Sequence, residues 1–135
     1  MIINQIAVFL ENRSGRICEF ARVLKDANIN IQTMNIADTS EYGILRAITD
    51  DNEKAIRVLK ENGFNTASTD LIGFQVADKP GEMHKVLQLL DQEKINISYL
   101  YSYAQVGSNT AAILLKVDSP DLAIRLLTHN GVKSF

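Results

Sequence analysis

The sequence is poor in the residues that most often form catalytic or metal sites. Its 135 residues include one cysteine, two histidines and no tryptophan. A single cysteine cannot form an intramolecular disulfide, and so few thiols and imidazoles do not predict a zinc or iron–sulfur centre. Cys18 and His84 lie beside the apolar stripes of two predicted helices, without a cluster of acids or histidines that would make either a nucleophile or a metal ligand. We therefore expect no enzymatic activity, no metal and no cofactor.

Long apolar runs and an excess of positive charge are also lacking. No stretch approaches the ~20 apolar residues needed to cross a bilayer. The segment Met1–Gln5 has neither the basic residues nor the small-residue cleavage site of a secretory signal. A formal net charge of −2 argues against binding to nucleic acid or to an anionic membrane. We expect a cytoplasmic protein without a nucleic-acid or membrane partner.

The chain does have the apolar content of a folded protein. Hydrophobic residues make up 46% of it and charged residues 22%, which is typical of a globular domain with a packed core. Its length suits one ordinary domain or two minimal ones.

An internal repeat favours two domains. Residues of the first half recur 66 positions later, and the offset becomes 68 near the end of the chain. The pairs at the first offset include Ile6 with Ile72, Gly15 with Gly81, Leu24 with Leu90 and Asn30 with Asn96; those at the second include Asp50 with Asp118, Leu59 with Leu127 and Gly63 with Gly131. The two added residues are expected in the turn at residues 106–109, because hairpin loops tolerate insertions. We predict domains at residues 1–69 and 70–135.

Each repeat reads as strand, helix, strand, strand, helix, strand. The short apolar runs at residues 5–10 and 71–77 predict central strands, and the pairs at 29–37 with 42–49 and 95–105 with 110–117 predict hairpins. The first helices carry apolar residues at i, i+3, i+4 and i+7, and Asn-Gly ends both second helices. The fourth strands are expected at residues 64–69 and 132–135.

This order defines an α+β fold of two tandem ferredoxin-like βαββαβ repeats, each an antiparallel sheet with its helices on one face. An isolated unit of this size buries only ~60% of its unfolded surface, so the two repeats should pack together. The second strands are polar enough to be edge strands, and we expect them to pair with each other into one continuous sheet.

The loop before each first helix has one pattern in both repeats. Asn12 precedes Gly15 by three residues, and Asp78 precedes Gly81 in the same way. One interpretation is structural, with the Asx side chain capping the helix and glycine permitting the turn. The other is functional, because a helix N-terminus with exposed amides suits a carboxylate ligand. The two interpretations are compatible.

A second shared pattern places an asparagine between two isoleucines at the start of each second strand. Strand alternation puts Ile29 and Ile31 on one face and Asn30 on the other, and the same holds around Asn96. The amide could contact a ligand or water.

Together, the segment Leu10–Gly15, the amphipathic helix and the segment Asn28–Ile31 resemble the start of an ACT domain. This regulatory module occurs in amino-acid biosynthetic enzymes such as phosphoglycerate dehydrogenase and the acetolactate synthase small subunit. The second repeat is similar, and the resemblance covers about residues 5–132. It implies a regulatory protein, allosteric in character, that binds a free amino acid or similar small ligand between two ACT-like domains.

The resemblance also implies the site. Family members use the first loop of one domain and the start of the second strand of another. Transferred to this sequence, the ligand-binding residues are Asn12, Ser14, Gly15 and Asn30, with Asp78, Pro80, Gly81 and Asn96 as their equivalents. Ser14 stands where the family often has the proline that Pro80 keeps, and Asp78 replaces an asparagine. The two sites are therefore expected to differ in affinity or ligand.

Two other classes of function remain open at this point. The same residues would also suit a regulatory subunit of an amino-acid biosynthetic enzyme. The protein could also form a homodimer. An RNA-binding module shares the βαββαβ plan, but it stacks bases on aromatic residues of the central strands and uses a basic face. Here the third strands, at residues 42–49 and 110–117, have one aromatic residue at an end and none in their bodies, and the chain is acidic overall.

Overall fold

The computed structural model describes residues 1–38, 41–104 and 108–134. Its elements follow the order β1 (Ile2–Glu11), α1 (Arg16–Asp26), β2 (Ile31–Asp38), β3 (Tyr42–Thr49), α2 (Asn52–Glu61), β4 (Asn65–Ala77), α3 (Glu82–Gln92), β5 (Ile97–Ala104), β6 (Thr110–Val117) and α4 (Pro120–His129). The tandem ferredoxin-like α+β fold is confirmed. Part of the turn at residues 106–109, where the two-residue insertion was expected, lies outside the described residues.

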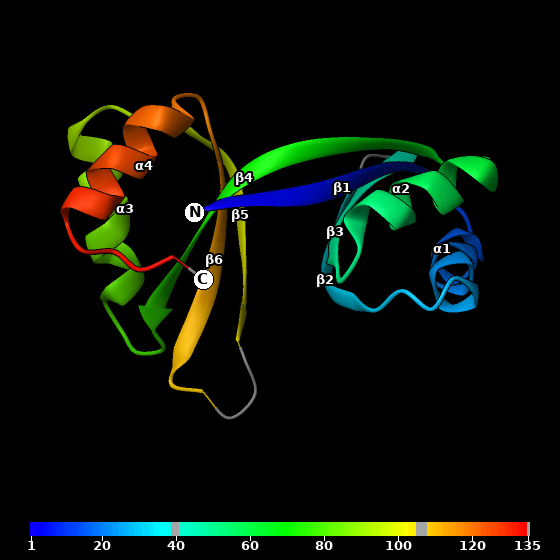
Figure 1. Ribbon diagram of the computed structural model, residues 1–135. Helices are drawn as coiled ribbons and strands as arrows, with labels where there is room; N and C mark the ends of the chain where they lie inside the picture. Colours follow the sequence, from blue (N-terminus) through cyan, green and yellow to red (C-terminus); the bar gives the residue numbers. More distant parts are fainter. Residues whose placement is uncertain (39–40, 105–107, 135) are drawn as a thin grey trace. The chain divides into compact units, whose positions relative to one another are not determined.

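The chain forms two compact units. One contains residues 4–69 and is called here the N-terminal unit; the other contains residues 70–135 together with residues 1–3 and is called the C-terminal unit. The strand order is β2-β3-β1-β4 in the first and β1-β4-β6-β5 in the second, because β1 and β4 run through both. Figure 1 shows α1 and α2 in the N-terminal unit and α3 and α4 in the C-terminal unit.

Two strands are longer than the sequence predicts. β4 spans 13 residues and joins the expected fourth strand of the first repeat to the first strand of the second. Only Asp70 lies between these two segments, and it is neither glycine nor proline, so the strand continues through it. β1 likewise begins at Ile2, and the main-chain oxygen of Met1 accepts a hydrogen bond of 2.7 Å from Gly73. The N-terminal residues thus pair beside β4 within the C-terminal unit.

The second strands are edge strands, as expected. β2 pairs with β3 and β5 with β6, and both stand at the ends of the strand order. The prediction that these two strands pair with each other is wrong. Each has one neighbour among the described strands, the third strand of its own unit.

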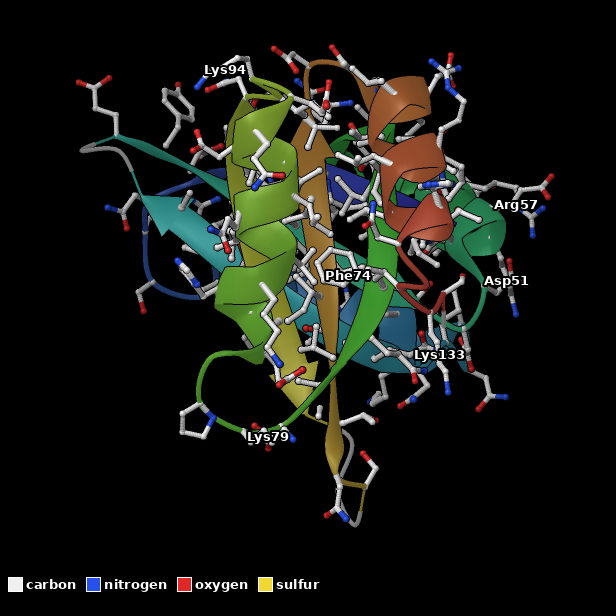
Figure 2. All side chains as sticks on the ribbon, turned by 90° about the vertical axis from the view of Figure 1, so that its left-hand side faces the viewer. Asp51, Arg57, Phe74, Lys79, Lys94 and Lys133 are labelled. Atoms are coloured by element: carbon white, nitrogen blue, oxygen red, sulfur yellow. The ribbon has the colours of Figure 1, made fainter. Side chains whose placement is uncertain are left out.

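Each unit has its own apolar core between sheet and helices. In the N-terminal unit the core includes Ile6, Phe20, Leu24 and Leu59, all 0% exposed. In the C-terminal unit Phe74, Leu90 and Leu127 are equally buried. Figure 2 shows Phe74 between α3 and α4. The stripes predicted for the first helices therefore face the core at Phe20 and Leu24 of α1 and at Val86 and Leu90 of α3, whereas Ile17 at the start of α1 is 47% exposed.

The residues that cap the helices agree only in part with those predicted from the sequence. Asn62 and Asn130 are the C-caps of α2 and α4, and the glycines after them have positive φ angles of 82° and 71°. Asp50 precedes Glu53 by three residues, a spacing that predicts a capping box with Asp50 as the N-cap of α2, and this prediction is wrong. The N-cap is Asp51, whose side chain accepts a hydrogen bond of 3.0 Å from the amide of Lys54.

Candidate functional site

The two loops before α1 and α3 have the same backbone geometry. Gly15 and Gly81 are the N-cap residues of these helices, with φ angles of 90° and 91°. L-residues rarely adopt this region, which explains glycine at both positions. A Cβ built on either glycine would have no neighbour within 4 Å. The space in front of both glycines is therefore open to a ligand.

The main chain of each loop is tied to the start of the third strand. The amide of Asn12 donates to the oxygen of Glu41 at 2.9 Å, and the amide of Asp78 donates to that of Asn109 at 2.8 Å. The expectation that the Asn12 and Asp78 side chains cap the helices is wrong, because neither helix has a side-chain cap. Both side chains are exposed. The first amides of an α-helix have no intrahelical acceptor, so these two helix starts can receive an acceptor from outside.

Ser14 and Pro80 occupy equivalent, exposed positions in these loops. The chain turns there in the same way in both units, since Arg16 N and Glu82 N each lie 3.5 Å from the carbonyl oxygen three residues earlier. Proline is compatible with this turn, and serine adopts the same conformation.

Charged side chains flank the loops differently in the two units. Arg13 contacts Glu11 at 2.7 Å, and its hydrogen bond and positive charge hold the pKa of that carboxyl below its ordinary value. In the C-terminal unit Lys85 contacts Glu82 at 2.7 Å and lowers the pKa of Glu82 through the same two effects, with a smaller contribution from Lys79. Both carboxylates are therefore ionised at neutral pH.

Replacing Lys85 with methionine should raise the pKa of Glu82 toward its ordinary value, because the hydrogen bond from Lys85 is the largest cause of the lowering. A pKa depressed by folding contributes stability above the unfolded-state pKa, and this stability is lost as the pH falls through the folded pKa. A titration of the carboxyl carbon shift by NMR measures the change. Lys79→Met is the control and should raise the pKa less, since Lys79 lies 4.0 Å away. An equal effect of both variants would contradict the assignment.

Asn30 and Asn96 lie just before β2 and β5 rather than inside them. The amide of Asn30 donates to the Asp50 carboxylate at 3.0 Å, and the carbonyl of Asn30 accepts from the Asp50 amide at 3.1 Å. Asn96 and Asp118 form the same pair of bonds at 3.1 Å each. These bonds use the main chain of the asparagines and leave their exposed side chains available. Ile29 is buried, as strand alternation predicts.

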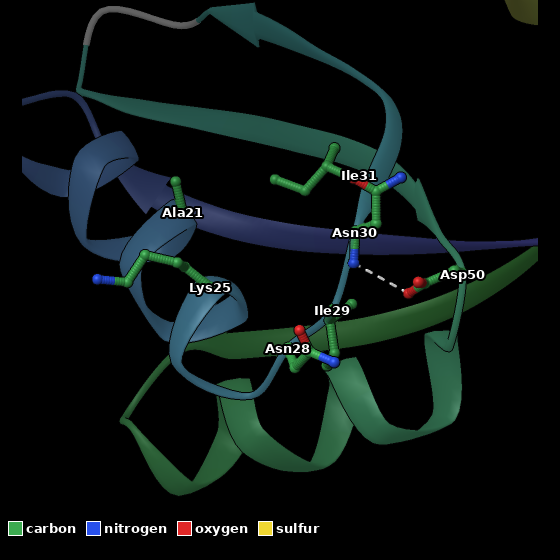
Figure 3. Close-up of a pocket in the computed structure, with 7 residues that line it drawn as sticks. All are labelled: Ala21, Lys25, Asn28, Ile29, Asn30, Ile31 and Asp50. Atoms are coloured by element: carbon green, nitrogen blue, oxygen red, sulfur yellow. Dashed lines mark hydrogen bonds between the residues drawn. The ribbon is translucent and has the colours of Figure 1, made fainter.

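A shallow hollow of about 460 Å³ surrounds Asn30. Figure 3 shows the residues that line it, including Lys25, Asn28 and Asp50. Asn28 has a positive φ of 56°, and Lys94 repeats this conformation in the C-terminal unit with 57°. Lys25, Asn28 and Asp50 are not among the site residues that the sequence predicts. Of these three residues, the internal repeat of the sequence marks only Asp50, which recurs as Asp118.

Apolar side chains beside the Asn12 loop were also missed. Ile17, Met34 and Ile36 line a hollow of about 210 Å³ and are 47%, 46% and 40% exposed. Asn12 lies with Ile17 and Ile36 around a smaller hollow of about 90 Å³. An amphiphilic ligand held at the loop would find an apolar surface here.

The loop residues and the strand-start residues lie at opposite ends of a helix. Within the N-terminal unit, Gly15 precedes α1 and Asn30 follows it, and α1 has 11 residues. At a rise of about 1.5 Å per residue the helix is ~16 Å long. A free amino acid is much shorter, so Gly15 and Asn30 of one unit cannot contact the same ligand molecule. The same argument separates Gly81 from Asn96.

The described residues contain few other groups that could bind a metal ion or react covalently. Among residues 1–38, 41–104 and 108–134, no three His, Cys, Asp or Glu side chains are grouped to hold a metal ion. Cys18 is an exposed free thiol. No helix in this part of the chain is long and apolar enough to span a membrane.

The fold and the repeated glycine loops define the class as a tandem ferredoxin-like module. The chain belongs to the ACT domain family: a model described as an ACT domain pair matches residues 1–134.

The chain is similar to protein BT0572 from Bacteroides thetaiotaomicron, with 37% identity and a TM-score of 0.94 over 100% of this chain and 92% of that one. It also has the fold of the regulatory subunit of aspartate kinase from Thermus thermophilus, with 12% identity and a TM-score of 0.64 over 96% of both chains. No curated protein matches.

Proposed function

We propose that this ACT domain pair is a non-catalytic regulatory protein that binds a free amino acid or similar small ligand. One observation carries the proposal: the loops at Asn12–Gly15 and Asp78–Gly81 repeat the same left-handed glycine, the same main-chain anchor and the same uncapped helix start. ACT domain membership supports a role in ligand-dependent regulation. The Thermus protein of the same fold is itself named a regulatory subunit.

The partial charges around the proposed site determine the orientation of the bound amino acid. Helix-start amides near Gly15 and Gly81 carry partial positive charge and favour the carboxylate of an amino acid. The side-chain oxygens of Asn12, Asp78, Asn30 and Asn96 are acceptors and favour its ammonium group. The reverse orientation would place like charges together.

The length of α1 supports a site shared between two ACT domains. Gly15 and Asn30 are too far apart within one unit to hold one amino acid. The loop of one ACT domain therefore meets the strand start of another in the proposed site. Such a site couples ligand binding to the association of domains, which gives the ligand control over assembly or over a partner enzyme.

A thermal-shift screen of the full chain against the twenty amino acids tests the proposal. A ligand at ~100 times its dissociation constant stabilises the folded protein by ~2.7 kcal/mol. Calorimetry with the amino acid identified should then show binding weakened by ~1–3 kcal/mol in Asn12→Ala and Asn30→Ala, because each loses a charge-assisted hydrogen bond. Asp78→Ala and Asn96→Ala test the second site in the same way.

Asn65→Ala is a matched control, because Asn65 is exposed at the start of β4 and outside both loops. Glycine variants are unsuitable, since φ near 90° strains any side chain whatever the space around it. Full affinity in all four site variants would refute the site. The absence of binding by any amino acid would refute the proposed function.

A further inference from the structure

The two units differ at one place where their repeats should be alike. In the N-terminal unit Phe64 follows α2, is 3% exposed, and packs edge-on against Phe20 with ring centroids 6.4 Å apart. The guanidinium of Arg16 lies 4.5 Å from the centre of the Phe64 ring. Two rings and a stacked cation thus close the space between α1 and the segment after α2.

The C-terminal unit has smaller side chains at the same positions. Val132 replaces Phe64, and Val86 replaces Phe20. The equivalence is structural, because Phe64 N donates to Leu59 and Val132 N donates to Leu127, both at 3.0 Å. Each replacement removes an aromatic ring from the space between α3 and the segment after α4.

A cavity of about 460 Å³ occupies this space in the C-terminal unit. Val76, Leu89 and Val132 line it and are partly exposed, whereas their counterparts in the N-terminal unit, Leu10, Val23 and Phe64, are only 2–3% exposed. The volume lies within the range of about 300–1,000 Å³ typical of small-molecule sites. The C-terminal unit therefore leaves apolar core surface uncovered where the N-terminal unit covers it with its own ring.

The charged groups at the cavity favour an anion. Glu82, Lys85 and Lys133 line it, which gives one more positive than negative charge. Glu82 and Lys85 already form an ion pair at 2.7 Å. Lys133 is exposed and stands where the N-terminal unit has the neutral Asn65. Figure 2 shows Lys133 beyond the end of α4, on the C-terminal segment that borders the cavity.

We propose that this cavity, which borders the Asp78–Gly81 loop, is a further binding site, for a small aromatic carboxylate. The ring of the ligand takes the place of the phenyl ring that Phe64 supplies in the other unit, and its carboxylate contacts Lys133. The ring covers the partly exposed side chains of Val76, Leu89 and Val132. The cavity borders the Asp78–Gly81 loop, because Glu82 follows Gly81 at the start of α3, but its apolar lining contains none of the proposed amino-acid-binding residues. The proposal therefore does not depend on the proposed function.

Methyl NMR on the full chain tests this with phenylpropionate as the probe. We expect saturable shifts of the Val86, Leu89 and Val132 methyl groups. Phenethylamine, which has the same ring but the opposite charge, and propionate, which lacks the ring, should bind at least tenfold more weakly. Absence of shifts at these methyl groups, or equal binding of phenethylamine, would overturn the proposal.

Val132→Phe restores the ring of the N-terminal unit and should abolish probe binding while raising the melting temperature. Leu122→Phe is the matched control, because Leu122 is 36% exposed on α4 and does not line the cavity. Lys133→Ala should weaken binding about tenfold through loss of a charge-assisted contact. If Val132→Phe does not fold, Leu89→Phe fills the same space and should give the same loss. Undiminished binding in a folded cavity-filling variant overturns the proposal.

Discussion

Replacing Phe20 with alanine should lower the free energy of unfolding of the N-terminal unit by ~3–5 kcal/mol. The Phe20 side chain is 0% exposed and forms an edge-on pair with Phe64. Its removal loses the transfer free energy of the ring and leaves a cavity that the sheet and α2 cannot close. Such a loss is a large share of the ~5–15 kcal/mol that stabilises an ordinary domain. Urea unfolding followed by amide NMR signals of residues 4–69 measures it.

Val86→Ala is the matched control, because Val86 holds the equivalent position in α3 and is 5% exposed. It removes far less apolar surface, and a neighbouring cavity already exists in that unit. We expect a loss of about 2 kcal/mol, read from the amide signals of residues 70–134. An equal or larger loss for Val86→Ala would contradict the view that the N-terminal unit is the more completely packed.

The sequence was sufficient for the helices, for most of the strands and for much of the topology, because period and repeat reinforce each other. The strand expected at residues 132–135 is wrong: the described part of this segment forms a single bridge between Lys133 and Gln75. The apolar residues of α1 recur at helical spacing, and α3 repeats them 66 residues later. Glycines at equivalent positions mark the same turns in both repeats. Each of these signals is local, and local signals remain readable without knowledge of the fold.

Strand pairing could not be predicted in the same way. Nothing in the sequence distinguishes a free edge of β2 from one that pairs with β5, because exposed edges allow several pairings. The sequence predicts separate strands at residues 64–69 and 71–77 rather than one continuous β4, because the first segment is polar and the second is apolar. The hydrogen bond between Met1 and Gly73 joins residues far apart in the sequence, and no periodic pattern of residues predicts it.

The candidate site was predicted where it depends on backbone geometry and missed where it depends on tertiary contacts. The repeated glycines predicted two equivalent loops, and the structure has them. The apolar hollow at Ile17, Met34 and Ile36 joins a helix to an edge strand and has no sequence signature. The cavity of the C-terminal unit is lined by two valines at the positions where the N-terminal unit has a contacting pair of phenylalanines, and the sequence does not show that these two positions meet in space.

A second large effect is expected from Asn52→Ala, because one side chain joins three elements of the N-terminal unit. Asn52 Oδ1 accepts hydrogen bonds from the amide and the hydroxyl of Thr49 at 2.9 and 2.8 Å. Its Nδ2 donates to the main-chain oxygen of Asn4 at 2.6 Å. The side chain thus ties the start of α2 to β3 and β1. The C-terminal unit has Pro120 at the equivalent position and cannot form this network.

We expect Asn52→Ala to destabilise the N-terminal unit by ~2–3 kcal/mol. Thr49 is 6% exposed, so water cannot readily replace the lost acceptor, and a buried donor left unpaired costs ~1–3 kcal/mol. The better helix propensity of alanine offsets only a few tenths of a kcal/mol of this cost. Asn62→Ala is the matched control, since Asn62 is exposed and its Nδ2 makes one bond, of 2.8 Å, to Val58. The Asn62→Ala change should lower the free energy of unfolding by about 1 kcal/mol or less, because it removes one exposed hydrogen bond.

A double-mutant cycle with Thr49→Val separates the network from a general loss of packing. Thr49→Val removes the hydroxyl donor while keeping the shape of the side chain, so part of the penalty for Asn52→Ala should disappear in the double variant. We expect the two changes together to cost ~1 kcal/mol less than the sum of the single changes, because contacting residues in one hydrogen-bond network are coupled. Strict additivity, or a cost for Asn52→Ala no greater than that for Asn62→Ala, would show that the three bonds do not act as one support for the junction of α2, β1 and β3.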